Sequence, residues 1–417
     1  MADKGKKSKA QKATTPEDGC LQQIQAWLVE SWSNDKSLDA LLQGLQEFVR
    51  QLFEEKDQEQ RIEYFEMSVE QLLKNFLPSL SEAEEIALEL WKGHSYETLG
   101  AFEKALKAFN RVVALSGSAA FAAQKAEAQR WIGHLHSMQN RWPAALKAYQ
   151  ESLSLARQSG DETGEANAYN SLGYYFFEQG DLDQAGSYWE KALELAERLQ
   201  ENKLTAQVNN NLGAVANVQG HWEKALAYYG ESVPRFERIG DQRGLAETYH
   251  NMAMTYADTK RWAEAGQHYE RSAELAKEIG DVRLQATVKL NRTELYLAIE
   301  DWNLAEALCY QALRTYLKLN DHLGESDAYK FLGIIQTGKK KWAQAKSYFE
   351  KSIRLTKKFK SPLCEAEAHF EYGLMLAQKR SPKSAQKQYE LALSLYSELN
   401  AENEMKAVRE AIAELSN

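Results

Sequence analysis

The sequence predicts an all-α protein built from a linear array of helical repeats, because three columns of residues recur at intervals of forty. The first column holds only alanine: Ala105, Ala145, Ala185, Ala225, Ala265, Ala305, Ala345 and Ala385. The second, twelve residues earlier, holds small residues: Gly93, Gly133, Gly173, Gly213, Ala253, Thr293, Gly333 and Gly373. The third, four residues after each alanine, holds aromatics and one cysteine: Phe109, Tyr149, Trp189, Tyr229, Tyr269, Cys309, Phe349 and Tyr389. Small residues let helices approach closely and aromatic rings fill the space beside them, so we expect these columns to pack between helices.

Each repeat is predicted to be a pair of helices joined by a turn. In the third repeat, apolar residues follow the three-and-four spacing of a helical face over 164–179 and again over 182–199, with Gly180-Asp181 between them. A second kind of turn joins consecutive repeats, at Gly160-Asp161, Gly240-Asp241, Gly280-Asp281 and Asn320-Asp321. We expect the glycine or asparagine to end one helix in the left-handed conformation and the aspartate to cap the next helix.

The motif in the third and fourth repeats resembles the tetratricopeptide repeat. Residues 168–173 read Ala-Tyr-Asn-Ser-Leu-Gly, followed by Gly180-Asp181-Leu182 and Ala185, and residues 209–213 read Asn-Asn-Asn-Leu-Gly, followed by Gly220, Trp222 and Ala225. The resemblance covers roughly residues 84–400. It departs from the family in its forty-residue period, against the usual length of about 34, and in lacking the proline that often ends a unit.

The resemblance implies a right-handed superhelical solenoid of about eight antiparallel helix pairs, in which the first helix of each pair lines a concave groove. Longer repeats with Gly-Asp connections are similar to those of polarity adaptors that bind G-protein regulators, of kinesin light chains and of bacterial peptide-sensing regulators. The sequence leaves open which of these the chain is nearest to.

Four segments follow in order along the chain. Residues 1–18 are polar and lysine-rich, and we expect them to be disordered. Residues 19–80 carry two amphipathic stretches, 38–52 and 64–76, that are out of phase with the repeats. They are either a cap that covers the apolar end of the first repeat or a separate partner-binding bundle. Residues 81–400 form the array, and residues 401–417 are expected to form a polar helix that caps its other end.

Several classes of function lack the residues they need. Cys20, Cys309 and Cys364 have no paired spacing, so we expect no disulfide framework. No apolar run is long enough for a secretory signal or a membrane span, which predicts a cytoplasmic protein. Phosphate-binding loops, nucleophile turns and metal-ligand pairs are missing, and His134 and His136 point to different sides of a helix. We therefore predict no enzyme activity, no cofactor and no metal.

The groove positions that the resemblance implies carry the candidate binding residues. Asparagine is about 0.6 kcal/mol worse than alanine in a helix, so asparagines at one register need a reason. A carboxamide can donate to and accept from one peptide unit of a bound chain. We predict partner contacts by Arg130, His134, Asn167, Asn170, Tyr174, Asn210, Asn217 and His250. Asn211, Asn251 and Asn291, two residues before the small column, are instead expected to form structural hydrogen bonds, and the second half of the groove is expected to be more apolar, with Leu290, Leu297, Ile334, Phe370 and Leu374.

Charge is distributed unevenly along the chain. Residues 330–390 hold fourteen Lys or Arg against five Glu, a net charge of +9, whereas the whole chain carries −9. The predicted basic surface is made of Lys339, Lys340, Lys341, Lys357, Lys358, Lys360, Lys379 and Arg380. It favours an acidic partner segment, and self-association with the acidic N-terminal third stays open. No aromatic residues alternate with these lysines to stack bases, which argues against nucleic acid.

Together these patterns predict a protein–protein interaction scaffold or adaptor. Its groove is expected to bind a peptide segment of a partner, and its basic C-terminal surface to favour acidic flanks of that segment. The alternative is a peptide-sensing regulator that acts through its N-terminal helices.

Overall fold

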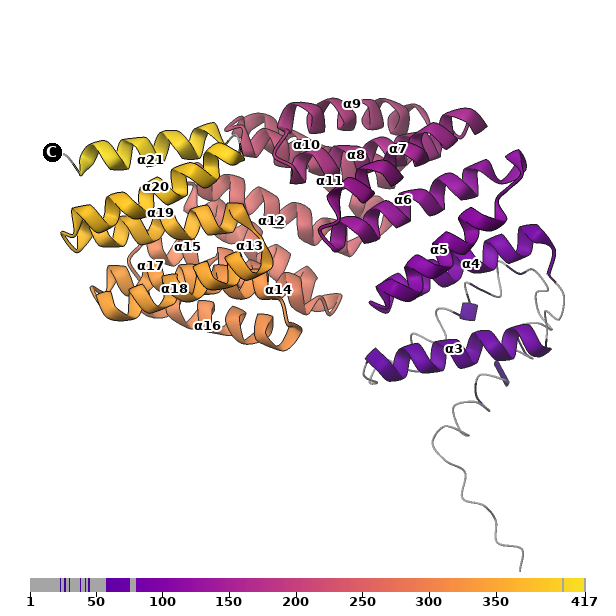
Figure 1. Ribbon diagram of the computed structural model, residues 1–417, viewed down its shortest axis with the longest axis horizontal. Coiled ribbons are helices and arrows are strands. Elements are labelled where there is room, and N and C mark those ends of the chain that lie inside the picture. The colour runs from indigo at the N-terminus through magenta and orange to yellow at the C-terminus, as the bar shows by residue number, and fades with distance from the viewer. Residues whose placement is uncertain are drawn as a thin grey trace, which may run out of the picture. The chain divides into compact units, whose positions relative to one another are not determined.

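The computed structural model describes residues 58–75, 80–399 and 401–415, together with a few single positions between residues 23 and 45. Within these residues the chain consists of helices and turns and contains no strand (Figure 1). The predicted all-α repeat architecture is confirmed. The chain divides into two compact units, residues 1–171 (unit 1) and 172–417 (unit 2). The lysine-rich segment 1–18 lies outside the described residues.

Unit 1 holds the N-terminal helices and the first two repeats. Its described helices are α3 (Gln58–Asn75), α4 (Glu82–Thr98), α5 (Phe102–Leu115), the 3-10 turn η1 (Ala119–Phe121), α6 (Ala122–Met138) and α7 (Trp142–Ser159). Helix α8 (Glu162–Glu178) spans the boundary between the units.

Unit 2 holds the remaining repeats and the last helix. Its helices are α9 (Leu182–Arg198), α10 (Asn202–Val218), α11 (Trp222–Ile239), α12 (Gln242–Asp258), α13 (Trp262–Glu278), α14 (Val282–Asn291), α15 (Thr293–Ala298), α16 (Trp302–Leu319), α17 (His322–Gly338), α18 (Trp342–Phe359), α19 (Pro362–Gln378), α20 (Pro382–Glu398) and α21 (Glu402–Glu414).

The three columns pack as the sequence predicts. A Cβ placed on Gly213 would lie 2.4 Å from the ring of Tyr229, and one on Gly333 would lie 2.6 Å from the ring of Phe349. The glycine is therefore required because the aromatic ring of the second helix lies directly on the backbone of the first. The alanine column is fully buried at the same contacts, as at Ala225.

The sixth repeat carries a larger residue in the small column and a smaller residue in the aromatic column. Thr293 stands in the small column and Cys309 in the aromatic one, and the first helix is interrupted between α14 and α15. The hydroxyl of Thr293 donates to the Lys289 carbonyl four residues earlier (3.3 Å), a bond that tends to bend helices. Cys309 is buried and its Sγ donates to the Ala328 carbonyl (3.1 Å), as expected for a structural thiol.

The turns between repeats confirm the predicted roles of glycine and aspartate. Gly240 ends α11 with φ of 70°, in the left-handed region, and Asn320 ends α16 with φ of 52°. The next residue then caps the following helix: the Asp241 carboxylate accepts from the backbone N–H of Gly244 (2.9 Å). These bonds satisfy backbone groups that a helix end leaves unpaired.

Helix α3 packs against the first repeat. Phe65 and Leu72 are buried in the same hydrophobic core as Trp91 of α4, and the rings of Phe65 and Trp91 are 5.1 Å apart. Leu42 and Leu45 are also buried there. The described apolar residues of 64–75 thus form a buried face, whereas most of the stretch 38–52 and Phe76 lie outside the described residues.

In unit 2 the last repeat lies beside the start of the unit. From α9 to α21 each helix packs on the next, with α14 and α15 together forming the first helix of the sixth repeat. A Cβ placed on Gly180, in the turn before α9, would lie 3.4 Å from the carbonyl oxygen of Leu399, which follows α20. Figure 1 shows the junction of α20 and α21 beside α9 and α10. The last repeat of unit 2 therefore contacts the turn that opens its first complete helix.

Candidate functional site

Within unit 2, the first helices of several neighbouring pairs contact one another. Helix α10 contacts α12, α12 contacts α14, and α17 contacts α19. We call the face that these helices share, including α15 and the end of α8, the inner surface. It contains the positions at which the sequence predicts partner contacts in this unit.

Three of the predicted contact residues bond to the next repeat. The Asn251 carboxamide donates to Oδ1 of Asn210 (3.1 Å), and the Asn217 carboxamide donates to Oδ2 of Asp258 (2.9 Å). Nδ2 of Asn291 lies 3.2 Å from Nε2 of His250. Each pair is separated by 41 residues, one repeat plus one position. The polar side chains therefore form a ladder between inner helices, which confirms the structural hydrogen bonds predicted for Asn251 and Asn291.

The same residues keep unpartnered atoms. Oδ1 of Asn217 and Nδ1 of His250 are buried and have no hydrogen-bond partner among the described residues. Burial lowers the pKa of His250 to about 4, so its imidazole is neutral at pH 7. Buried polar atoms are nearly always hydrogen-bonded, so these two atoms mark polar positions on the first helices that the protein itself leaves unsatisfied. Tyr174 and Met254 are exposed on the same first helices, with 40% and 36% of their surface accessible.

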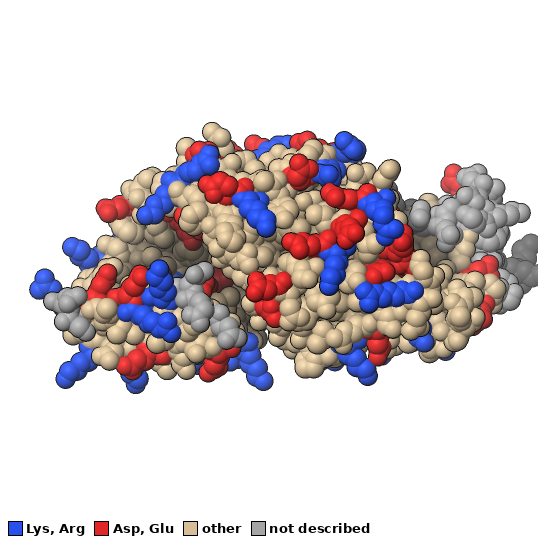
Figure 2. Space-filling model, turned by 90° about the horizontal axis from the view of Figure 1, so that it is seen from above, with Lys and Arg blue, Asp and Glu red and all other residues tan. Residues whose placement is uncertain are grey.

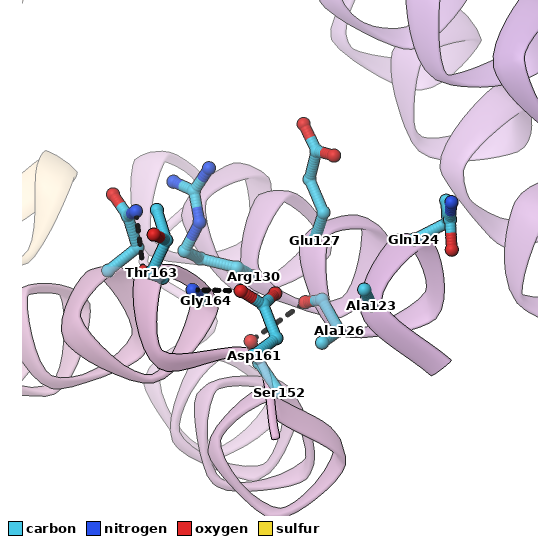
Figure 3. Close-up of a pocket in the computed structure, with 10 residues that line it drawn as sticks. Ala123, Gln124, Ala126, Glu127, Arg130, Ser152, Asp161, Thr163 and Gly164 are labelled. Carbon is cyan, nitrogen blue, oxygen red and sulfur yellow. Dashed lines mark hydrogen bonds between the residues drawn. The ribbon is translucent and has the colours of Figure 1, made fainter. Parts of the chain in front are cut away.

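The predicted contacts of unit 1 lie on α6 and α8. Arg130 of α6 borders a pocket of about 320 Å³ and forms no ion pair with the described carboxylates. Figure 3 shows Arg130 and Glu127 rising from α6 on the same side of this pocket. Burial lowers the pKa of Arg130, and the nearby charge of Glu127 opposes that effect. Asn167, which also lines the pocket, donates to the Thr163 carbonyl of its own helix (2.9 Å).

The other two predicted contact residues of unit 1, His134 and Asn170, do not line that pocket. Nε2 of His134 lies 3.9 Å from Oε1 of Glu97, and its ring meets Trp131 edge-on at 5.4 Å. Asn170 is half-buried on α8 and does not line the pocket. The structure therefore brings together Arg130 and Asn167 in unit 1, and separately joins Asn210, Asn217 and His250 to an asparagine or aspartate of the following repeat.

Five carboxyl groups on the inner surface were not among the predicted contacts. They come from α12, α15, α17 and α19 and form what we call the inner acidic cluster: Asp258, Glu294, Asp327, Glu367 and Glu371. Lys330 is the cation among them, paired with Glu367 and 3.6 Å from Asp327. Among the described residues, no cation forms an ion pair with Asp258, Glu294 or Glu371.

Burial and mutual repulsion favour the protonated carboxyl groups in this cluster. Burial, followed by the charge of Asp258, raises the pKa of Glu294 to about 7, and burial raises that of Glu371 to about 7. Burial alone would lower the pKa of Lys330, but Glu367 and Asp327 raise it on balance. Asp258 and Glu294 are nevertheless exposed to solvent, so protein surrounds the cluster without covering it.

Tyr269 of α13 carries a buried hydroxyl without a partner among the described residues. Its ring is fully buried beside Ala253 and Val288, 5.7 Å from the ring of His250. Burial, followed by the charges of Glu294 and Asp258, raises the pKa of this hydroxyl. In the preceding repeat the Tyr229 hydroxyl bonds to Thr255, whereas the equivalent of Thr255 is Leu295.

The predicted basic surface is divided between two edges of the array. Lys339, Lys340, Lys341, Lys379 and Arg380 lie in the turns between paired helices. Lys357, Lys358 and Lys360 lie at the other end of α18, a helix of 18 residues that is about 27 Å long. Lys339 is also engaged, because its Nζ lies 2.5 Å from Oε2 of Glu306. Figure 2 shows basic and acidic side chains intermixed on the face in view.

No group of three or more His, Cys, Asp or Glu among the described residues is arranged to hold a metal ion. Within the same residues, every helix is too short or too polar to cross a lipid bilayer.

Several solved structures share the fold of this chain. A Rap protein complexed with competence and sporulation factor aligns with a TM-score of 0.61 and 12% identity, over 93% of this chain and 99% of that one. The apo quorum sensor NprR from B. thuringiensis gives 0.56 and 18% identity, over 91% and 98%. The Rap conjugation gene regulator of plasmid pLS20, solved with a peptide, gives 0.56 and 16% identity, over 82% and 95%. These likenesses concern the fold.

Sequence comparison identifies the repeats directly. No curated protein matches the chain. Two models described as tetratricopeptide repeat match it, one over residues 90–162 and the other over 164–238, 204–278, 244–303 and 284–358. These ranges cover most of the helix pairs and share their forty-residue phase. The chain therefore belongs to the tetratricopeptide repeat family.

Proposed function

We propose that this protein is a non-catalytic, cytoplasmic adaptor that holds a peptide segment of a partner protein on its inner surface. The observation that carries the proposal is the polar ladder, in which Asn217 and His250 each keep one hydrogen-bonding atom without a partner. Peptide units offer the N–H and C=O groups that such atoms bind. The neighbouring exposed Tyr174 and Met254 supply apolar contact area for side chains of the peptide.

The basic turns support a second part of the same proposal. Lys340, Lys379 and Arg380 lie in the turns between paired helices of the last two repeats, on one edge of the array. Their charge favours an acidic flank of the bound peptide, and salt weakens that attraction.

The proposal is tested by selecting random linear peptides on the immobilised full-length protein. Tyr174→Ala combined with Asn217→Ala should weaken binding of a selected peptide by more than about 1 kcal/mol, because it removes an aromatic contact and a hydrogen bond. The matched control is Gln267→Ala with Tyr310→Ala, which changes an exposed amide and an exposed tyrosine on the second helices α13 and α16. Equal losses in both variants would place the binding site elsewhere.

A peptide-sensing regulator is the second candidate, and the packing of α3 favours it. Phe65 and Leu72 share a core with the first repeat, so the N-terminal helices can respond to a change in that repeat. The proteins of similar fold include a quorum sensor and peptide-bound Rap regulators. In a regulator, removing residues 1–80 abolishes the output and preserves peptide affinity. In an adaptor, the same removal mainly lowers the melting temperature because it exposes the first repeat.

A further inference from the structure

Three turns that join successive repeats of unit 2 lie side by side at one edge of the array. We call this surface, formed by residues 277–283, 317–323 and 357–363, the junction edge. Nη2 of Arg283 in the first segment lies 2.7 Å from Oδ2 of Asp321 in the second. The ring of His322 in the second segment stacks on that of Phe359 in the third, with 4.2 Å between the ring centroids. These contacts join the three segments into one surface.

The junction edge exposes apolar side chains from all three segments. The exposed residues are Ile279 (37%), Val282 (51%), Leu317 (49%), Leu319 (46%), Leu323 (42%) and Leu363 (47%). Ile279 and Leu319 are forty residues apart, as are Leu323 and Leu363, so the exposure follows the repeat. Apolar residues exposed singly are ordinary, whereas a group of them on one surface marks a contact with a partner or a membrane.

Basic side chains that no described carboxylate neutralises lie on the same edge. Lys318, Lys358 and Lys360 are exposed and form no ion pair with a described residue. The three segments hold six Lys or Arg against three Asp or Glu, a net charge of +3. The exposed apolar residues are therefore accompanied by positive charge.

Two of the three acidic side chains of this edge are used within the protein. Asp321 caps α17 by accepting from the backbone N–H of Gly324 (3.1 Å) and also pairs with Arg283, and its side chain is only 9% exposed. Asp281 caps α14 in the same way. Glu278 is the remaining carboxylate of the three segments and is exposed. The surface that the junction edge offers to another molecule is therefore mainly apolar and basic.

This combination is complementary to the surface of an anionic lipid bilayer. Aliphatic side chains enter the boundary between headgroups and acyl chains, and lysines are attracted by the negative headgroups. Stable attachment takes two such signals together, and the junction edge has both. A partner helix or peptide needs a groove for its side chains. The residues here lie in turns and in the first or last turn of helices, which a broad, flat surface contacts at once.

We propose that the junction edge docks the protein on an anionic membrane surface. Leu319 and Leu363 are among the side chains that enter the bilayer interface, and Lys358 and Lys360 contact the headgroups. The proposal concerns the ends of the helices and does not depend on peptide binding by the inner surface. The turns at the opposite edge stay accessible to a partner protein while the junction edge is docked.

The experiment measures flotation of the full-length protein with vesicles of two compositions. One contains phosphatidylcholine alone, and the other contains equal parts of phosphatidylcholine and phosphatidylglycerol. The wild type should float with the anionic vesicles and much less with the neutral ones, and added salt should reduce the bound fraction. Absence of flotation with the anionic vesicles would overturn the proposal.

Matched charge reversals test whether the lysines of this edge are responsible. Lys358→Glu with Lys360→Glu should weaken partitioning into anionic vesicles about tenfold or more, because it replaces attraction to the headgroups with repulsion. The control, Lys340→Glu with Arg380→Glu, makes the same change of net charge at the opposite edge, again in exposed turns. Equal losses in both variants would mean a general attraction to negative surfaces, and the junction edge would be the wrong assignment.

Matched leucine replacements test the apolar contribution. Leu319→Ser with Leu363→Ser should weaken partitioning about tenfold or more, because it removes two side chains from the acyl boundary. The control, Leu304→Ser with Leu391→Ser, changes two leucines of similar exposure, 40% and 38%, on α16 and α20 away from the junction edge. Both variants should melt near the wild-type temperature because the replaced side chains are exposed. Unchanged partitioning of the first variant would refute insertion.

An acidic surface of another protein is the competing occupant of the junction edge. Random linear peptides selected on the immobilised wild type separate the two cases. Peptides that lose affinity for Leu319→Ser with Leu363→Ser, together with no flotation on anionic vesicles, would replace the membrane by a protein partner and overturn the proposal. Flotation that depends on the junction edge, with peptide affinity unchanged in the same variant, supports membrane docking at a surface separate from peptide binding.

Discussion

Nδ2 of Asn291 lies 3.2 Å from Nε2 of His250 and joins the first helices of two successive repeats. His250 is buried, and its other ring nitrogen has no partner among the described residues. The imidazole therefore depends on Asn291 for the hydrogen bond that holds its orientation on the inner surface.

Asn291→Ala should lower the free energy of unfolding by about 1–3 kcal/mol, because it leaves a buried imidazole without any partner. Urea unfolding followed by circular dichroism measures the loss. The control is Asn110→Ala on α5, where the exposed carboxamide bonds only to the Leu106 carbonyl of its own helix. That change should cost little or nothing, so comparable losses at both positions would contradict the role given to Asn291.

Stability should fall when the pH is lowered below the ordinary pKa of histidine. Burial lowers the pKa of His250 from 6.5 to about 4, so the unfolded chain binds a proton between these values and the folded protein does not. The contribution of His250 is therefore present above pH 6.5 and is lost as the pH falls toward 4. The expected slope approaches about 1.4 kcal/mol per pH unit.

The readout is the difference between wild type and His250→Gln in urea unfolding across this pH range. A difference is needed because Glu294 and Glu371, with pKa values raised to about 7, act in the opposite direction and make stability fall as the pH rises. The variant should show a flatter decline on the acid side. Parallel curves for the two proteins would show that His250 is not the group responsible.

Two glycines of the fourth repeat should respond oppositely to alanine. A Cβ on Gly213 meets the Tyr229 ring at 2.4 Å, so Gly213→Ala should destabilise by about 1–3 kcal/mol through overpacking. A Cβ on Gly230, inside α11, meets nothing within 4 Å, so Gly230→Ala should stabilise by about 0.5–1 kcal/mol through helix propensity. Thermal unfolding of both variants tests the pair, and two changes of the same sign would refute the packing argument.

Because the basic residues lie on two opposite edges of the array, charge reversal at each edge tests whether an acidic flank of the peptide binds at only one of them. Lys340→Glu with Arg380→Glu changes the edge formed by the turns between paired helices, whereas Lys358→Glu with Lys360→Glu changes the opposite edge by the same charge. Only the first pair should weaken binding of a peptide that carries an acidic flank. The wild-type affinity should also decrease with added salt. Equal effects of both pairs would indicate a general charge effect without a defined edge.

Local rules predicted the fold well because they act within one repeat. The ring of Tyr229 lies on Gly213, and Asp241 caps the helix that follows Gly240, as their spacing indicates. The binding surface was harder to predict because its contacts join different repeats. Asn210 was expected to be available to a ligand, yet its oxygen accepts from Asn251, a pairing of 41 residues that depends on the rotation between neighbouring first helices.

The inner acidic cluster shows a second reason why the groove positions of the repeat did not identify all residues of the inner surface. Glu294, Asp327 and Glu367 occupy groove positions of the repeat, whereas Asp258 and Glu371 lie at positions outside those registers. The ion pairs of Lys330 join Asp327 and Glu367, which lie on successive first helices. Leu290, expected to make the second half of the groove apolar, is instead 3% exposed and belongs to the core.

The contact between Gly180 and Leu399 changes how unit 2 should melt. In an open array, a terminal repeat packs against only one other repeat, whereas an internal repeat packs against two. Terminal repeats therefore fray before internal ones unfold. Here the last repeat has a second neighbour, because Leu399 meets the turn that opens α9. Helix α21 lies beyond this junction, but unfolding of α20 must break it. Unit 2 should therefore lose its structure as a single cooperative block, with amide protection nearly as high in α20 as in α12.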